Sequence, residues 1–441
     1  MRRHIIFSVM LATIVISSIT FITIVISLFL FPRIHIGKIS IHTYWIIALV
    51  GALLLICSTL VPLKEVFKEL TADTAINPLK ILVLFFSMTF ISILLDEFGL
   101  FRFLASVAAK RAKNQYVLFF SFYFLVAALT IFTSNDVVIL TFTPFICFFC
   151  KRMKINPIPY LISEFAAANT WSLLFIIGNP TNIFLGTSAG ITFIDYVKVM
   201  ALPTIAAGSM ELLIIFLIFR HKLSEKIGEI DIETEKIENK PMLICGVVHL
   251  LVCLIFLVIA NYIHIEMWLV SLICATSLLV TTSIISLIMR KDFHFIIQAW
   301  KRLPYPLIPF FLSMFIIVVT FNYQGISSHI ASLLGGRNPV WVYGFTSLLM
   351  SNVINNIPMS ILYTGLCSHL ESTVYLRGIY ASIIGSNIGA FLTPIGALAG
   401  IMFLDIVNKH EVKFSFTQFV EYGFVIAIPT ITVALLILFL I

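Results

Sequence analysis

Residues 115–150 read QYVLFFSFYFLVAALTIFTSNDVVILTFTPFICFFC. One helix needs only about 20 residues to cross the roughly 30 Å apolar core of a bilayer, so this stretch is too long for a single crossing. The polar run from Thr133 to Asp136 interrupts it near its middle. Irregular backbone at membrane depth is tolerated only where it is buried in protein or lines a cavity. The stretch therefore predicts a re-entrant hairpin, in which two short helices enter and leave the membrane on one side.

The whole chain is as apolar as this stretch. Of its 441 residues, 60% are hydrophobic and 11% are charged, and the mean hydropathy is +1.08. This composition excludes a water-soluble enzyme and leaves room for roughly ten to thirteen crossings. The net charge of +7 comes from basic residues in short connections between apolar runs, so we expect no nucleic-acid partner. The seven cysteines are interpreted as small hydrophobic residues, and we expect neither a metal site nor a cofactor.

The sequence repeats itself at an offset of 226 residues. FFSM at residues 85–88 recurs as FLSM at residues 311–314, and PTI at residues 203–205 recurs at residues 429–431. Internal duplication in a chain with many crossings is typical of secondary transporters, in which two repeats move around a site near the midplane.

A polar stretch from His221 to Lys240 separates two sets of six apolar segments. We therefore predict an N-terminal membrane repeat (1–220), a cytoplasmic linker (221–241) and a C-terminal membrane repeat (242–441). In the second repeat, residues 339–366 are interrupted by the polar runs SN and NNIP, which predicts a second re-entrant hairpin.

The distribution of basic residues indicates how the repeats are oriented. With five crossings and one hairpin per repeat and the N-terminus outside, 20 of the 28 Lys and Arg residues lie on the cytoplasmic side and 8 lie outside. Arg2 and Arg3 are among the 8 and count against this topology. The sequence thus predicts an all-α polytopic membrane protein of two inverted repeats, each with about five transmembrane helices, a re-entrant hairpin and a broken helix.

A broken helix follows each hairpin. Residues 178–182 read GNPTN, and residues 385–389 read GSNIG and are followed by TPIG at residues 393–396. Gly and Pro interrupt these helices. A broken helix exposes carbonyl groups at one end, which suit a cation, and amide groups at the other, which suit an anion.

The polar residues at the four breaks are the candidate binding site. Because the repeat relates them, we expect Asn135 and Asn169 to share one cluster and Asn355 and Asn387 to share a second, facing cluster. The alternative is that small and amide side chains only let helices pack closely. The candidate substrate- or ion-binding residues are Ser134, Asn135, Asp136, Asn169, Thr170, Gly178, Asn179, Thr181, Asn182, Asn352, Asn355, Asn356, Ser386, Asn387 and Thr393.

Acidic residues inside apolar segments are few, and each is costly in a membrane. Asp136 and Asp96 are candidates for proton or cation coupling, with a hairpin cap and a place at the membrane interface as the respective alternatives. Glu164 and Glu211 are interpreted as lying near helix ends or facing another subunit. No Lys or Arg falls in the middle of a crossing, so a neutral or singly charged solute is easier to accommodate than a multivalent anion.

At these breaks the sequence resembles the arsenite and antimonite efflux permeases of the ArsB type. These belong to an ion-transporter superfamily that includes sodium-coupled dicarboxylate and citrate carriers. The stretches that carry the resemblance are LLDEFG at residues 94–99, Asn135-Asp136, NNIP at residues 355–358 and LTPIGALA at residues 392–399. The resemblance implies a dimeric antiporter that moves a transport domain against a scaffold, as an elevator, and exports neutral trivalent arsenite in exchange for protons.

Two positions depart from the arsenite permeases, since Asn169 and Asn387 stand where those proteins usually carry an acidic residue. Residues 178–182 look more like the carboxylate carriers. We therefore predict a secondary transporter of a small inorganic or anionic solute, coupled to protons or sodium. The alternatives are a sodium-coupled di- or tricarboxylate transporter and a sodium/proton antiporter. We expect a homodimer in the lipid bilayer of a bacterial or archaeal inner membrane, and not an enzyme, because convergent catalytic groups are missing.

The charge distribution predicts that residues 221–240 and 290–302 are cytoplasmic and that both termini lie outside. Single cysteines introduced at 221–240 or 290–302, in a background without the native cysteines, should react with a membrane-impermeant maleimide only after the membrane is opened. Labelling of the 221–240 stretch in intact cells would contradict the inverted arrangement.

Overall fold

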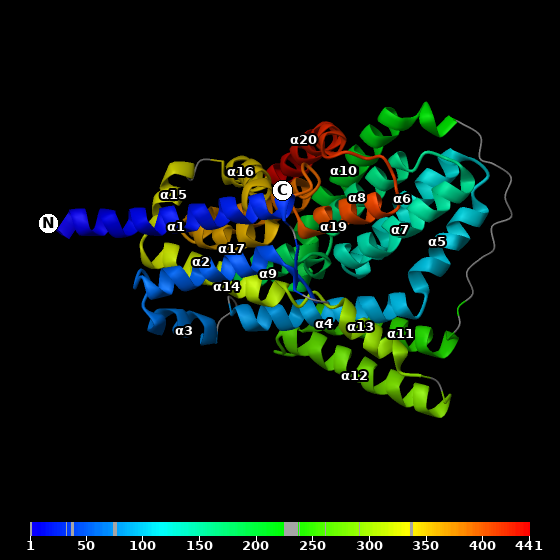
Figure 1. Cartoon of the computed structure of the whole chain (residues 1–441), viewed down its shortest axis with the longest axis horizontal. Coiled ribbons are helices and arrows are strands. Elements are labelled where there is room, and N and C mark those ends of the chain that lie inside the picture. Colours follow the sequence, from blue (N-terminus) through cyan, green and yellow to red (C-terminus); the bar gives the residue numbers. More distant parts are fainter. Residues whose placement is uncertain are drawn as a thin grey trace.

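The computed structural model describes residues 2–31, 33–36, 39–73, 77–224, 237, 239–260, 262–290, 292–335 and 338–441. Over these residues the chain is helical, apart from one antiparallel hairpin of β1 (Arg33–Ile36) and β2 (Ile39–His42) (Figure 1). Most of the linker predicted at 221–241 lies outside the described residues, which here include only 221–224, 237 and 239–241.

The helices fall into two series. The first series is α1 (Arg2–Leu30), α2 (Thr43–Cys57), α3 (Leu63–Thr71), α4 (Pro78–Glu97), α5 (Leu100–Arg111), α6 (Gln115–Phe132), α7 (Asn135–Met153), α8 (Ile158–Trp171), η1 (Ile176–Gly178), α9 (Pro180–Ser188), α10 (Phe193–Phe219) and η2 (Lys222–Ser224). The second series is α11 (Lys240–Ile259), α12 (Met267–Ile288), α13 (His294–Arg302), α14 (Leu307–Tyr323), α15 (Ile326–Leu334), α16 (Pro339–Ile354), α17 (Asn356–Cys367), α18 (Ser372–Gly389), α19 (Leu398–Lys409) and α20 (Phe416–Leu440).

Many of these helices are long and apolar enough to span a bilayer. Within the described ranges there are eight such candidate spans, formed by α1, α4, α6, α10, α11, α12, α13 with α14, and α20. The prediction of an all-α polytopic membrane protein is confirmed.

The first hairpin is broken where the sequence predicts it. Helix α6 ends at Phe132 and α7 begins at Asn135, with extended backbone at Ser134 between them. In the second hairpin only Asn355, which has a φ of 73°, separates α16 from α17. The helix runs unbroken through Ser351 and Asn352, so the additional break expected there was wrong, because polar side chains alone do not end a helix.

Two further helices are broken in mid-course. The first is interrupted between α8 and α9 by residues 172–179, and the second between α18 and α19 by residues 390–397. Gly178 allows the chain to fold back on itself, because a Cβ atom there would lie 2.3 Å from the carbonyl oxygen of Ser172.

The two series contain the same succession of elements. Gly99 and Gly325, which are 226 residues apart, precede α5 and α15 with left-handed backbone, at φ 86° and 73°. Each series then has a hairpin, a broken helix and a long helix with an internal proline, Pro203 in α10 and Pro429 in α20. Helices α10 and α20 pack directly against each other.

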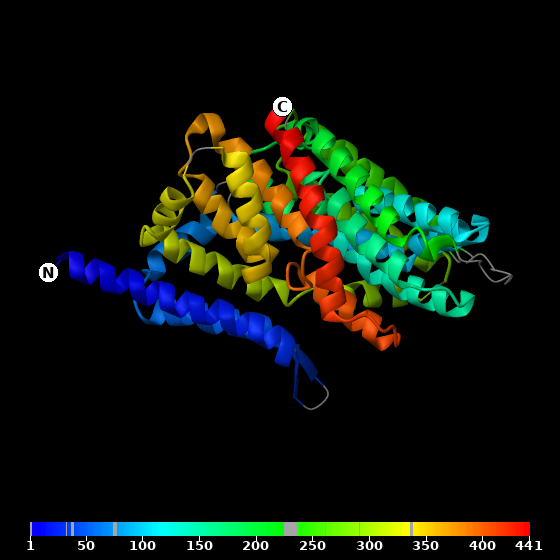
Figure 2. The ribbon, with the colours of Figure 1, turned by 90° about the horizontal axis from the view of Figure 1, so that it is seen from above.

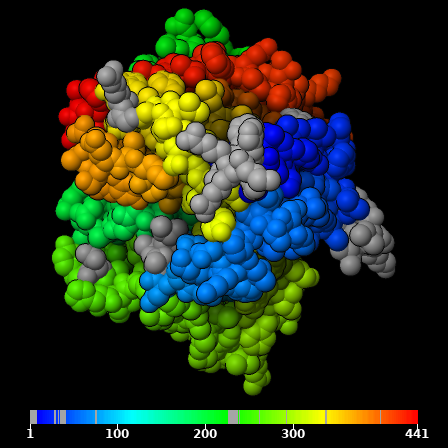
Figure 3. All heavy atoms as spheres, turned by 90° about the vertical axis from the view of Figure 1, so that its left-hand side faces the viewer, coloured from blue at the N-terminus to red at the C-terminus, as the bar shows by residue number. Residues whose placement is uncertain are grey.

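The helices pack in two groups. The core bundle consists of α6–α10 and α16–α20, in which α16 packs on α18, α10 on α20 and α6 on α8. The flanking bundle consists of α1–α4 and α11–α14, in which α4 packs on α12, α2 on α14 and α1 on α2. Figure 2 shows α1 running along one side of the molecule. Seen from the left-hand end of Figure 1, blue N-terminal segments lie against yellow segments near residue 330 (Figure 3).

Several short elements were not expected from the sequence. The strands β1 and β2 and the helices α3 and α13 occupy stretches interpreted as connections. In α3 and α13 only Val66 and Ala299 are fully buried, so both helices are largely exposed and polar on one side. These elements are shorter than a membrane crossing, so the length of an apolar segment does not predict them.

The left-handed glycine at position 99 gives a test of the repeated geometry. A Cβ atom at Gly99 would meet nothing within 4 Å, so Gly99→Ala should destabilise the protein only through the backbone, by about 1 kcal/mol. In detergent the melting temperature should fall by roughly 2 °C. The melting temperature of Gly99→Asn should fall less, because asparagine adopts this backbone conformation more readily than alanine. Equal melting temperatures for all three proteins would contradict the assigned backbone.

Candidate functional site

The last turn of α8 meets the first hairpin. Asn135, the first residue of α7, donates from Nδ2 to Oδ1 of Asn169 at 3.2 Å, and Asn169 donates to the carbonyl of Phe165 at 2.8 Å. Both asparagines are buried. The structure thus brings Asn135 and Asn169 together as the repeat predicts.

Asn387, at the end of α18, joins the two halves of the chain. Its Oδ1 accepts hydrogen bonds from Ser172 Oγ and Asn179 Nδ2, both at 2.9 Å. Its Nδ2 donates to Asn182 Oδ1 at 2.6 Å and to the carbonyl of Ile383 at 2.9 Å. No hydrogen bond joins Asn387 to Asn355 among the described residues, because Asn387 crosses to the first broken helix and Asn355 bonds the carbonyl of Ile395.

The polar side chains of the first broken helix hold its backbone. Asn179 Oδ1 caps α9 by accepting from the backbone N–H and the hydroxyl of Thr181, each at 3.1 Å. Asn182 Nδ2 donates to the carbonyls of Ser172 at 2.8 Å and Phe175 at 3.3 Å. These amides satisfy carbonyl and N–H groups that the interruption leaves without helical partners.

The second broken helix is held in the same manner from the second hairpin. Asn352 Oδ1 accepts from the N–H of Thr393 at 3.0 Å and from its hydroxyl at 2.6 Å, while Asn352 Nδ2 donates to the carbonyl of Gly389 at 2.9 Å. Asn355 Nδ2 donates to the carbonyl of Ile395 at 3.0 Å. Asn352 and Asn355 therefore act mainly as backbone partners.

Four buried polar atoms at the breaks remain unpaired. Among the described residues, no hydrogen-bond partner is found for Ser134 Oγ, Asn135 Oδ1, Asn356 Oδ1 or Ser386 Oγ. Buried polar atoms in proteins are almost always hydrogen-bonded to protein or water, so these four are the atoms open to a ligand, an ion or water. In the same described ranges, no group of three His, Cys, Asp or Glu side chains could hold a metal ion.

Asp136 faces a cavity of about 700 Å³ between the two bundles. Its side chain is partly exposed, and it has no hydrogen-bond or ion-pair partner among the described residues. The cavity is lined by Leu30, Phe31, Arg33, His42, Tyr44, Phe85, Thr89, Ile93, Asp136, Val137, Leu140, Arg302, Leu303, Pro304, Leu307, Ile401, Met402 and Asp405. A path from solvent thus ends beside the first hairpin break.

Asp96 is engaged elsewhere. Arg302 of α13 forms ion pairs with Asp96 and Glu97, each with an N···O distance of 2.6 Å, and Thr141 Oγ1 donates to Asp96 Oδ2 at 3.0 Å. This compensation favours a structural role for Asp96 over the coupling role suggested by the sequence.

Two acids that the sequence analysis placed at helix ends or toward another subunit lie inside the core bundle. Glu164 is 1% exposed and accepts hydrogen bonds from Thr143 Oγ1 at 3.0 and 3.1 Å. Glu211 is 0% exposed and accepts a hydrogen bond from Thr170 Oγ1, so the proton of the Thr170 hydroxyl is used there. Their signal in the sequence was a single Glu within each apolar segment.

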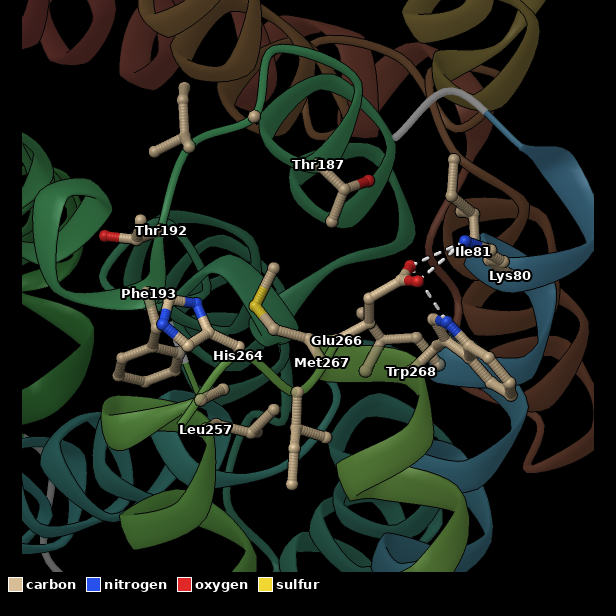
Figure 4. A pocket seen from close by; sticks show the side chains of 15 residues that line it. Lys80, Ile81, Thr187, Thr192, Phe193, Leu257, His264, Glu266, Met267 and Trp268 are labelled. Carbon is tan, nitrogen blue, oxygen red and sulfur yellow. Dashed lines mark hydrogen bonds and ion pairs between the residues drawn. The ribbon is translucent and has the colours of Figure 1, made fainter. Parts of the chain in front are cut away.

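A smaller cavity, of about 370 Å³, lies at the start of α4 beside the α11–α12 connection, and none of the candidate residues lines it (Figure 4). There Glu266 accepts from Lys80 Nζ at 2.8 Å and from the indole of Trp268 at 3.0 Å. Lys80 also bonds Asp73 at 2.5 Å, which lowers the pKa of that exposed carboxyl below its ordinary value. The charged groups of this cavity are mutually paired.

Comparison with known proteins gives the relationships of the chain. The family model described as "Citrate transporter" (CitMHS) matches residues 34–375. The "46 kDa membrane protein" of Mycobacterium leprae is 27% identical over 406 residues, which cover 88% of this chain and 91% of that protein. The "Arsenical pump membrane protein" of Escherichia coli K12 is 25% identical over 368 residues, which cover 80% of this chain and 84% of that protein.

A solved structure supports the fold. The crystal structure of the Alcanivorax borkumensis YdaH transporter superposes with a TM-score of 0.54 over 97% of both chains, at 13% sequence identity. At that identity the likeness concerns the fold alone. The apolar helices, the paired breaks and the family match agree that this is a multi-pass membrane transporter and not an enzyme. The chain belongs to the citrate transporter family.

Proposed function

We propose that the protein is an ion-coupled secondary transporter of a small, hydroxylated inorganic solute of the arsenite type. The observation that carries this proposal is the set of four unpaired atoms at the breaks, Ser134 Oγ, Asn135 Oδ1, Asn356 Oδ1 and Ser386 Oγ. They come from the two hairpins and from α18, so a solute bound to them would contact both repeats.

The chemistry of these atoms favours a neutral ligand with hydroxyl groups. The amide oxygens of Asn135 and Asn356 only accept hydrogen bonds, whereas the hydroxyls of Ser134 and Ser386 can donate or accept. A carboxylate or another bare anion offers only acceptors and would leave the amide oxygens unpaired. Neutral arsenite carries three hydroxyl groups, which can donate to amide oxygens. A relative's name, arsenical pump membrane protein, agrees with this class of solute.

We further propose that the core bundle moves against the flanking bundle. The two halves of the chain would form inverted repeats, and the protein would be a homodimer in the inner membrane. The cavity of about 700 Å³ lies between the bundles and reaches Asp136. Polar contacts at the boundary of the core bundle, among the described residues, include Thr141 to Asp96 at 3.0 Å and Arg33 of β1 to Asp405 at 3.8 Å. Polar links of this kind are compatible with sliding of one bundle past the other.

The second candidate is a sodium-coupled carboxylate transporter, which the match to the citrate transporter model favours. The free oxygens of Asn135 and Asn356 are also suitable sodium ligands. A bound sodium ion would supply the positive charge that a carboxylate requires, since no Lys or Arg hydrogen-bonds any of the candidate substrate-binding residues at the breaks among those described.

Purified protein in proteoliposomes distinguishes the two candidates. Arsenite and citrate fluxes would be measured with a pH gradient or a sodium gradient imposed separately. We expect arsenite flux driven by the pH gradient and no citrate flux. Citrate flux that follows the sodium gradient, without arsenite flux, would replace the first candidate with the second. Absence of flux for both solutes would contradict this assignment of substrate.

The contrast between Asn387 and Asn356 tests which amides bind the solute. Asn387→Ala should lower the free energy of unfolding by about 2 to 3 kcal/mol, because it leaves the buried polar groups of Ser172 and Asn179 without a partner. Asn356→Ala removes an unpaired oxygen and should change stability by less than about 1 kcal/mol, yet impair transport. Melting curves and flux assays on both variants provide the measurement. Full transport by Asn356→Ala would show that its amide only packs.

A further inference from the structure

Glu211 lies one hydrogen bond behind the break in α8. Its Oε2 accepts from the hydroxyl of Thr170, which is the neighbour of Asn169 and stands two positions before Ser172. Those two neighbours make the contacts to the first hairpin and to Asn387. A change at Glu211 therefore acts on the turn of helix that connects the breaks.

The surroundings of Glu211 contain no compensating charge. The carboxylate is 0% exposed, and its Oε1 has no hydrogen-bond partner among the residues that the structure describes. Arg220 is nine residues further along α10, about 13 Å along the helix axis. A buried carboxylate with one hydrogen bond and no cation is strongly disfavoured as an anion.

One hydroxyl beside Glu211 can accommodate a protonated carboxyl group. Tyr123 of α6 lies next to the carboxylate, donates its own proton to the carbonyl of Gly208 at 2.7 Å and accepts from Trp171 Nε1 at 3.1 Å. While its proton is donated to Gly208, the Tyr123 oxygen can accept a hydrogen bond from a protonated Glu211 carboxyl group. Trp171 is partly exposed, so this cluster reaches toward the surface of the core bundle.

The other titratable groups on the helices around α10 have no hydrogen bond or ion pair to Glu211 among the described residues. Tyr116 of α6 bonds the carbonyl of Arg220, and Tyr160 and Glu164 of α8 bond Gln115 and Thr143. On α11 these groups are Lys240, Cys245, His249 and Cys253, and His249 bonds Ser277. The remaining ones are Glu421 and Tyr422 of α20, where Tyr422 contacts the ring of Phe219, and Asp195, Tyr196 and Lys198 at the opposite end of α10. Within the described residues, Tyr123 is thus the titratable group that faces Glu211.

We propose that Glu211 is a proton-binding site of the transport cycle. This proposal rests on the proposed function and assigns the proton as the coupling ion. The carboxyl group holds a proton in the state described here. When the break in α8 meets water on one side of the membrane, the O–H bond breaks and the proton passes to water. The carboxylate then keeps the hydrogen bond from Thr170 until a proton from the opposite side restores the acid. Asn169 and Asn387, which carry no charge, need not take part.

The test uses full-length protein in proteoliposomes and the solute that the wild-type protein transports. Glu211→Gln should abolish flux driven by a pH gradient and flatten the pH dependence, while solute exchange at equal pH continues. Glu164→Gln is the matched control, because Glu164 is a buried acid with both oxygens bonded to Thr143. Glu164→Gln should keep the wild-type pH dependence. A wild-type pH profile in Glu211→Gln would overturn the proposal.

Two further measurements test the proposal if Glu211→Gln does not fold or if the assigned substrate is wrong. Thr170→Val removes the donor that stabilises the ionised carboxylate, so the pH midpoint of transport should rise by about one to two units. Infrared spectra of purified protein during a pH titration need no substrate and should show a protonated carboxyl band at neutral pH that Glu211→Gln lacks. The same band in wild type and Glu211→Gln would contradict the proton site, whatever the outcome of the flux assays.

Discussion

Backbone groups at a helix break inside a membrane have no water to bond and must find partners within the protein. This constraint governs the centre of the molecule. Asn182 serves the carbonyls left by the first broken helix, and Asn352 and Asn355 serve the second. Each of these amides comes from a different element than most of the groups it satisfies, so the breaks are stable only when the hairpins and broken helices are packed together.

The same constraint separates structural amides from functional ones. An amide whose oxygen and nitrogen are both used by neighbouring groups, as in Asn387, connects the first broken helix to α18. An amide with an unpaired oxygen, as in Asn135 or Asn356, is incomplete without a ligand, an ion or water. Asparagine serves both purposes because it carries no charge and can donate and accept at once, which keeps the desolvation cost of a buried site low.

The buried and half-buried acidic side chains also differ in the partners that hold them. At the boundary between the bundles, Asp96 and Glu97 are neutralised by Arg302, and Arg33 faces Asp405. Inside the core bundle, Glu164 and Glu211 are held by threonine hydroxyls, with no cation in contact among the described residues. Acids of the first kind stabilise the arrangement of helices. Of the second kind, Glu211 has an oxygen without a partner among the described residues and contacts the turn of α8 that connects the breaks, which suits it to changing protonation.

Local sequence determined the helical membrane class, the break at residues 133–134, the interruptions near residues 178 and 393, and the family resemblance, because apolar length, Gly and Pro act on neighbouring residues. The offset of 226 residues also foretold the matching glycines at 99 and 325. Tertiary structure alone decided that Asn387 crosses to residues 172–182 and that Glu211 lies behind Thr170. Those contacts join residues about 40 to 215 positions apart, and their partners depend on how the bundles pack, which no local pattern records.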